Sequence, residues 1–134
     1  MVKKHVLIVD DDPDIVEAMR LILEAHEYEV TSAGNTADGL DAVLKTKPDV
    51  IILDVMMETD TDGFHFAYTL RNAESDSPYE PFKKTPILML TAISQRTGMQ
   101  FNPSNDEEFL PVDDFVEKPI KPEQLIAKIQ KLTT

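Results

Sequence analysis

The pattern along the chain is one of short apolar runs separated by longer amphipathic stretches. The run at residues 6–9 is continuous and rich in β-branched side chains, as is typical of a strand that is covered on both faces. Other segments of similar length follow it, some of them less uniformly apolar. The segments predicted as strands are residues 6–9, 28–33, 50–53, 86–90 and 114–119.

Helices are predicted between these strands, because apolar side chains recur there at spacings of three and four residues. Asp12 and Pro13 predict the start of the first helix, with a capping carboxylate and a proline in the first turn. Asn35 is expected to cap the second helix, Gly63 to open the third, and Pro122 to lie in the first turn of the last. The apolar positions expected on the inner faces are Ile15, Met19, Ile22 and Leu23; Ala37, Leu40, Val43 and Leu44; Phe64, Ala67, Tyr68 and Leu70; and Leu125, Ile126, Ile129 and Leu132.

This alternation determines the expected fold class. Five strands interleaved with helices indicate parallel pairing through right-handed crossovers. We therefore expect an α/β fold with a doubly wound, five-stranded parallel sheet and helices on both faces. Ligands bind beyond the carboxyl ends of the strands in such a sheet. The polar residues at those ends are Asp10 and Asp11 after the first strand, Asp54 after the third, Thr91 after the fourth, and Lys118 in the fifth.

These side chains predict a site for a divalent cation and a phosphoryl group. Three carboxylates that lie close together repel one another unless a cation sits among them. Mg²⁺ (or Mn²⁺) suits such a site, because it is held by a few carboxylates and keeps water and phosphate as its other ligands. We interpret Asp54 as a nucleophile that accepts a phosphoryl group, with Lys118 neutralising charge on the phosphoryl oxygens and Thr91 donating a hydrogen bond.

Four motifs follow one another along the chain: VLIVDDD, IILDVMM, LMLTA and FVEKPI. In this order they resemble the receiver domains of bacterial two-component response regulators, and the resemblance covers nearly the whole chain. It implies a flavodoxin-like strand order 2-1-3-4-5 and a single receiver domain over residues 1–134. It also implies a protein that is phosphorylated by a sensor histidine kinase or a histidine phosphotransfer protein and signals by a conformational shift. A stand-alone, chemotaxis-regulator-like protein is expected, and the alternative of a longer protein with an output domain stays open.

The resemblance assigns a role to each residue of the site. It implies that Asp54 is the phosphoacceptor and that Asp10 and Asp11 bind the metal, one of them through water. The backbone carbonyl of Met56 is expected to be another metal ligand.

The same resemblance implies a switch. Thr91 is expected to move toward the phosphoryl group, and Phe115 to turn inward. Lys118 resembles the charge partner of the phosphoryl group, and the Lys118–Pro119 bond resembles the family's cis peptide.

The chain departs from the family pattern in the loop after Asp54. Glu58 stands where the family usually has proline, and Met56 is apolar where many relatives carry a polar side chain that can position an attacking water. We therefore expect a phosphoacceptor that assists its own phosphorylation and dephosphorylates slowly, not an enzyme with turnover. Residues 72–85 are interpreted as a surface loop, and residues 94–113 lack helical periodicity where a regular fourth helix is expected, which predicts an atypical output surface.

Composition restricts the partners. With 134 residues and 42% hydrophobic content, the chain suits one compact domain. The formal net charge of −12 argues against direct binding of nucleic acid or anionic lipid. The absence of cysteine fits the cytoplasm, and the N-terminal apolar run is too short for a signal sequence or a membrane span. Protein partners are therefore expected; the downstream target, and the choice between a monomer and a phosphorylation-dependent dimer, stay open.

Two other functions stay open on sequence grounds. One is a phosphatase of the haloacid dehalogenase type, for which VDDDP could supply the motif on the first strand. The chain lacks room for the cap domain common there, and its best nucleophile, Asp54, follows the third strand. The other is a receiver-like module that binds proteins without phosphorylation. The altered loop after Asp54 favours this module, whereas the retained acids, Thr91 and Lys118 oppose it.

Overall fold

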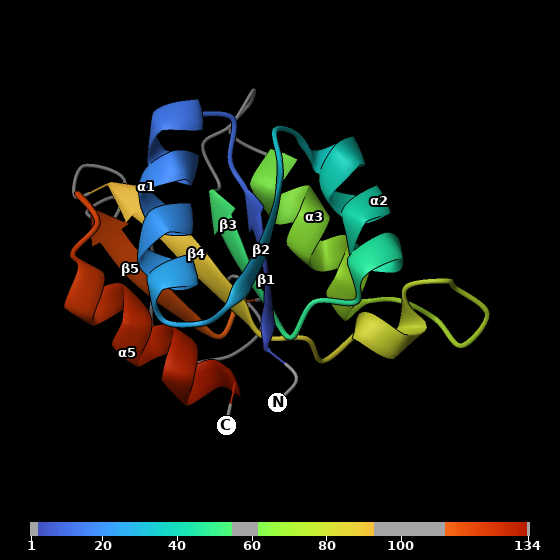
Figure 1. Ribbon diagram of the computed structural model, residues 1–134. Coiled ribbons are helices and arrows are strands. Elements are labelled where there is room, and N and C mark those ends of the chain that lie inside the picture. Colours follow the sequence, from blue (N-terminus) through green and yellow to red (C-terminus); the bar gives the residue numbers. More distant parts are fainter. Residues whose placement is uncertain (1–2, 55–61, 93–111, 134) are drawn as a thin grey trace.

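A five-stranded parallel sheet forms the centre of the molecule (Figure 1). The computed structural model describes residues 3–54, 62–92 and 112–133, with the backbone alone at residues 62–65 and 91–92. The strand order is β2-β1-β3-β4-β5, which confirms the predicted fold class and strand order. The strands are β1 (His5–Val9), β2 (Glu29–Ala33), β3 (Val50–Asp54), β4 (Ile87–Ala92) and β5 (Asp114–Lys118).

Helices cover both faces of the sheet. Figure 1 shows α1 and α5 on one side and α2 and α3 on the other. Helix α1 packs against α5, and α2 packs against α3. The helical elements are α1 (Pro13–Ala25), α2 (Thr36–Thr46), α3 (Asp62–Arg71), the short 3₁₀ helix η1 (Glu80–Phe82) and α5 (Pro122–Thr133). None of the helices in these described ranges has the length and apolar content needed to cross a bilayer.

The central strands are apolar throughout because each of their faces meets a different hydrophobic cluster. Val6 and Ile8 of β1 belong to the cluster under α1 and α5, whereas Leu7 and Val9 belong to the cluster under α2 and α3. All four side chains are fully buried. Burying an aliphatic side chain of this size contributes about 1.5–3 kcal/mol, so these strands anchor both layers of helices.

The strand register brings the polar strand ends to one edge of the sheet. Val9 of β1 pairs with Leu53 of β3, so the next residues, Asp10 and Asp54, lie side by side at this edge. On the other side of β4, Ala92 pairs with Lys118 at the end of β5. The sheet therefore positions the acids and the lysine at the same end.

The predicted helix starts are confirmed where the structure describes their side chains. Asp12 accepts hydrogen bonds from the backbone N–H groups of Asp14 and Ile15, and Asn35 accepts one from Asp38. These bonds satisfy N–H groups that have no partner within the helix, and thereby fix where each helix begins.

Two of the expected inner-face residues point outward. Tyr68 is 44% exposed, and Ala37 is exposed as well. The inner face of α3 is instead formed by Phe66, Ala67 and Leu70, which are fully buried. Phe66 and Tyr68 stand two positions apart, on opposite sides of the helix, so one aromatic must be outside; the phenol hydroxyl of Tyr68 tolerates water.

The segment after α3 is more ordered than the predicted surface loop. It contains η1. Tyr79, which precedes η1, and Phe82, its last residue, are half-buried against the α2 and α3 cluster. The guanidinium of Arg71 donates to the carbonyl oxygens of Lys83 and Thr85 at 2.9 Å, and to the carboxylate of Asp113. These bonds fix the end of the segment to the start of β5. The prediction for residues 94–113 falls almost entirely outside the described residues.

Candidate functional site

Three carboxylates meet beyond the ends of β1 and β3. Asp10 and Asp54 are each 3% exposed, whereas Asp11 is exposed. One oxygen of each side chain lies within 4.8 Å of the other two. Three negative charges at this separation are unfavourable unless protons or a cation compensate them. The structure thus places together the acids that the sequence analysis predicted as metal ligands.

Within this cluster, the ionised form of Asp10 is disfavoured by its surroundings. Its Oδ1 accepts a hydrogen bond from the Asp12 N–H at 2.9 Å, but its buried Oδ2 has no hydrogen-bond partner within the described residues. Burial is the main reason that the pKa of Asp10 is raised from 3.8 to about 6. The negative charge of Asp54, and the proton that the two carboxyl groups can share, act in the same direction; the Asp12 N–H and the Lys118 ammonium oppose them.

Within the part of the chain that the structure describes, Lys118 supplies positive charge to the site. Its Nζ lies 3.5 Å from Oδ2 of Asp54, which is a long distance for a hydrogen bond within an ion pair. A charge-assisted hydrogen bond is usually about 2.7–2.9 Å long, so the two groups are near neighbours without close contact. The Lys118–Pro119 peptide bond is cis, as expected.

These residues fit a hard divalent cation. Carboxylate oxygens are the ligands that Mg²⁺ selects, and one of these oxygens is buried without a hydrogen-bond donor. A cation there would interact with Oδ2 of Asp10 and would offset the repulsion within the cluster. The group of Asp10, Asp11 and Asp54 could therefore hold a metal.

Comparison with known proteins decides the family. Residues 6–130 match the response regulator receiver domain. The chain belongs to this family. The match covers the sheet, the acidic cluster and most of α5, and with them every residue predicted for the site.

Curated relatives of this receiver domain are longer than it is. The chain is 35% identical over 130 residues to the phosphate regulon transcriptional regulatory protein PhoB of Pseudomonas aeruginosa, covering 97% of this chain and 52% of the relative. It is 28% identical over 128 residues to the DNA-binding response regulator MtrA of Mycolicibacterium smegmatis, covering 96% and 50%. The chain thus spans about half the length of the curated relatives it matches.

Solved structures that resemble this receiver domain include proteins of its own size. The chemotaxis response regulator CheY4 of Vibrio cholerae is 31% identical, with a TM-score of 0.77 and coverage of 98% of this chain and 99% of that one. A putative response regulator from Chloroflexus aurantiacus is 28% identical, with a TM-score of 0.80 and coverage of 98% of both chains. Neither the dehalogenase-type phosphatase nor the phosphorylation-independent module finds support in these matches.

Among the predicted switch and loop residues of this receiver domain, the structure describes the side chain of Phe115 only. Thr91 lies in β4 opposite Glu117, but its side chain is outside the described residues, as are Met56 and Glu58. Phe115 lies in β5 and is half-buried. The ammonium of Lys128 lies 5.4 Å from the centre of its ring.

Two ion pairs could not be predicted from the sequence. Lys128 of α5 pairs with Asp114 of β5, and Arg71 at the end of α3 pairs with Asp113, the residue before β5. The members of these pairs stand far apart in the sequence, and single charged residues near strand or helix ends carry no local signal for a partner.

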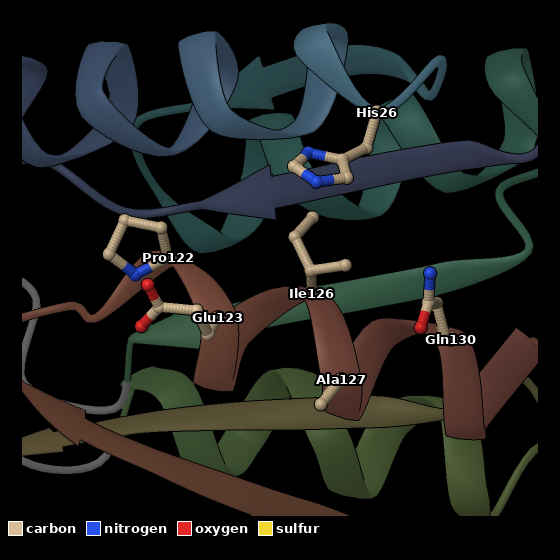
Figure 2. Close-up of a pocket in the computed structure, with 6 residues that line it drawn as sticks. All are labelled: His26, Pro122, Glu123, Ile126, Ala127 and Gln130. Atoms are coloured by element: carbon tan, nitrogen blue, oxygen red, sulfur yellow. The ribbon is translucent and has the colours of Figure 1, made fainter.

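The receiver domain also has a groove between α1 and α5 (Figure 2). Its volume is about 440 Å³. It begins at Pro122 and Glu123, in the first turn of α5 just after Lys118 and Pro119, and extends along α5 toward the end of α1. The residues that line it are His26, Pro122, Glu123, Ile126, Ala127 and Gln130.

Proposed function

We propose that this receiver domain accepts a phosphoryl group on Asp54 from a phosphohistidine of a sensor histidine kinase or a histidine phosphotransfer protein, in a reaction that requires Mg²⁺ (or Mn²⁺). The observation that carries this proposal is the acidic cluster, in which Asp54 lies near the carboxylate of Asp10 and the ammonium of Lys118. One oxygen of Asp10 is buried without a hydrogen-bond donor among the described residues. Such an arrangement suits an incoming group with negative charge that brings or recruits a cation.

The metal would be held by Asp10, Asp11 and Asp54, with the Met56 carbonyl as a further expected ligand. When bound, it supplies positive charge that neutralises the phosphoryl oxygens.

The side chains of the protein have separate roles in the transfer. An oxygen of Asp54 forms a bond to phosphorus while the bond between phosphorus and the donor's imidazole nitrogen breaks, so the carboxylate reacts in its ionised form. Lys118 is placed to interact with the phosphoryl oxygens, because its ammonium already lies 3.5 Å from Oδ2 of Asp54. Thr91 and Phe115 are the proposed switch, and the apolar Met56 is proposed to slow the loss of the phosphoryl group.

The groove between α1 and α5 is the proposed contact for the donor protein. A donor must bring its phosphohistidine to the edge of the sheet where Asp54 and Lys118 lie, and the groove extends from that edge along the helices. The residues that line it include the buried Ile126 and the exposed Ala127. An apolar helix face of the donor fits such a surface. The resulting change of surface is proposed to alter binding of a downstream protein or of a second copy of the domain.

Intact-mass measurement after incubation with acetyl phosphate, with and without Mg²⁺, tests the acceptor. We expect a gain of one phosphoryl group that depends on Mg²⁺ and disappears in Asp54→Asn. Asp76→Asn is the matched control, because Asp76 is an exposed acid in the segment after α3, outside the acidic cluster. Phosphorylation that persists in Asp54→Asn would move the acceptor elsewhere. No phosphorylation of the native protein by acetyl phosphate or by any of several histidine kinases would favour a module that signals by protein contacts alone.

A further inference from the structure

The ring of Phe115 lies beside a charged residue from another element. Lys128 of α5 places its Nζ 5.4 Å from the centre of the Phe115 ring. The same Nζ donates a hydrogen bond to Oδ1 of Asp114 at 3.0 Å. That oxygen also accepts from the backbone N–H of Phe115, at 2.8 Å. The ammonium of Lys128 therefore contacts the ring of Phe115, the carboxylate of Asp114 contacts its backbone, and the two charged groups contact each other.

The position of these groups on the sheet explains how α5 reaches this ring. Val116 of β5 faces the cluster under α1 and α5, so strand alternation directs Phe115 to the opposite face. Strand β5 lies at the edge of the sheet in the order β2-β1-β3-β4-β5. Lys128 is half-buried and flanks the buried Ile129, which packs beneath the sheet. Its long side chain therefore reaches from α5 to the ring of Phe115.

The contact is partly shielded from water. The side chains of Lys128 and Asp114 are 24% and 20% exposed. Both an ion pair and a cation–π contact are stronger when they are partly desolvated. Asp114 also fixes the ammonium, since its carboxylate holds Nζ close to the ring. The three residues thus act as one unit at the start of β5.

We propose that Lys128 is a positioning residue for Phe115, which holds the ring in its half-buried position before phosphorylation and thereby opposes the switch. The proposal rests on the function proposed above, in which Phe115 moves when Asp54 is phosphorylated. Removing the ammonium would free the ring and favour the arrangement that accompanies phosphorylation. A cation–π contact at a partly exposed site is worth a factor of about two to five in the balance between two conformations.

Three variants test the proposal. Lys128→Met removes the charge and keeps the length of the side chain, whereas Lys128→Arg keeps a cation that can contact both the ring and Asp114. Lys84→Met is the control for the loss of one positive charge, because Lys84 is exposed in the segment after η1. The first measurement is the NMR signals of the Phe115 ring protons, assigned with Phe115→Leu. The second is the rate of Asp54 phosphorylation by acetyl phosphate with Mg²⁺, followed by intact mass.

We expect Lys128→Met to shift the ring signals and to raise the phosphorylation rate by about two- to fivefold. Lys128→Arg should restore both, and Lys84→Met should change neither. Unchanged ring signals in Lys128→Met would overturn the proposal, as would shifted signals with an unchanged rate or an equal rate change in Lys84→Met. Failure of the native protein to become phosphorylated, both by acetyl phosphate and by several histidine kinases, would refute the proposed function instead, and the ring signals would then decide by themselves whether Lys128 holds Phe115.

Discussion

Lys118 and Asp54 lie 3.5 Å apart although they come from strands that do not pair with each other. Strand β4 runs between β3 and β5, so the lysine must reach across the end of β4 to approach the aspartate. This ion pair connects β3 and β5, and the role of Lys118 in phosphorylation can be tested by replacing it.

Replacing Lys118 with alanine should slow the phosphorylation of Asp54. The variant removes a positive charge that lies 3.5 Å from the acceptor, and the loss of one such group at a reacting centre typically lowers a rate by roughly 10²-fold. The rate with acetyl phosphate, followed by intact mass, is the measurement. Lys121→Ala serves as the control, since Lys121 is an exposed lysine three residues along the chain. Equal rates for the two variants would remove Lys118 from the mechanism.

The raised pKa of Asp10 predicts how pH affects stability without metal. The native state binds the Asp10 proton more tightly than the unfolded chain, with a pKa of about 6 against 3.8. This contribution is fully present below about pH 4 and is lost as the pH rises through about 6, a change of about 3 kcal/mol. Urea unfolding in EDTA at pH 4, 5, 6 and 7 should show the loss in the native protein and not in Asp10→Asn. Parallel curves for the two proteins would contradict the assignment.

The same titration governs metal binding in the opposite sense. A cation competes with the proton of Asp10, so the affinity for Mg²⁺ should rise as the pH increases from 5 to 7. Stabilisation by added Mg²⁺ should therefore be small at pH 5 and larger at pH 7, as measured by the melting temperature. Asp10→Asn should lose most of this stabilisation at both values, whereas Asp76→Asn should retain it.

A charge in the groove between α1 and α5 should separate protein donors from small ones. Ala127→Glu places a carboxylate where an apolar face of the donor is proposed to dock, and burying it would lower phosphotransfer from a protein donor by about tenfold or more. The reaction with acetyl phosphate should be unchanged, because that donor needs no docking surface. Ala37→Glu on α2 makes the same change on an exposed position across the sheet. A loss of equal size in both variants, or with both donors, would exclude the groove as the docking surface.

Gly39 of α2 lies close against two side chains of the core. A Cβ there would lie 3.0 Å from Cε2 of Phe66 and 3.1 Å from Cγ2 of Val9, and both of these side chains are fully buried. Gly39→Ala should destabilise the fold by about 1–2 kcal/mol, even though alanine favours helices by up to about 1 kcal/mol. At Gly34 no atom lies within 4 Å of an added Cβ, so Gly34→Ala is the matched control. Urea denaturation of the two variants gives the comparison, and a stabilised Gly39→Ala would show that the core yields readily.

Most of the fold could be predicted because the strands carry a strong signal. A run such as residues 6–9 is apolar at every position only when both faces of the strand are buried. The inner face of α3 could not be predicted as reliably, because Phe66 and Tyr68 are both aromatic and the helical pattern there does not decide between them. The packing against β1 and α2 decides it, and that depends on residues distant in the sequence.

The composition of the site could be predicted, whereas its energetics could not. Asp10, Asp11 and Asp54 follow strands whose ends must meet in a parallel sheet, so their proximity follows from topology. Asp10 is buried, and its Oδ2 lacks a hydrogen-bond donor among the described residues, because of how neighbouring segments cover this side chain. The sequence pattern does not specify that packing. The contacts of Lys128 likewise depend on the exact packing of α5 along β5.

The hydrogen bonds of Arg71 have a consequence for protein engineering. Its bonds to Lys83, Thr85 and Asp113 hold the two ends of the segment after α3 at a fixed separation, while Glu74 to Asp76 in the middle are exposed. Lengthening a loop whose ends are already fixed carries a small entropic penalty, about 0.6 kcal/mol for each doubling of its length. A fluorescent reporter or affinity tag inserted between residues 74 and 76 should therefore leave the sheet and the acidic cluster intact.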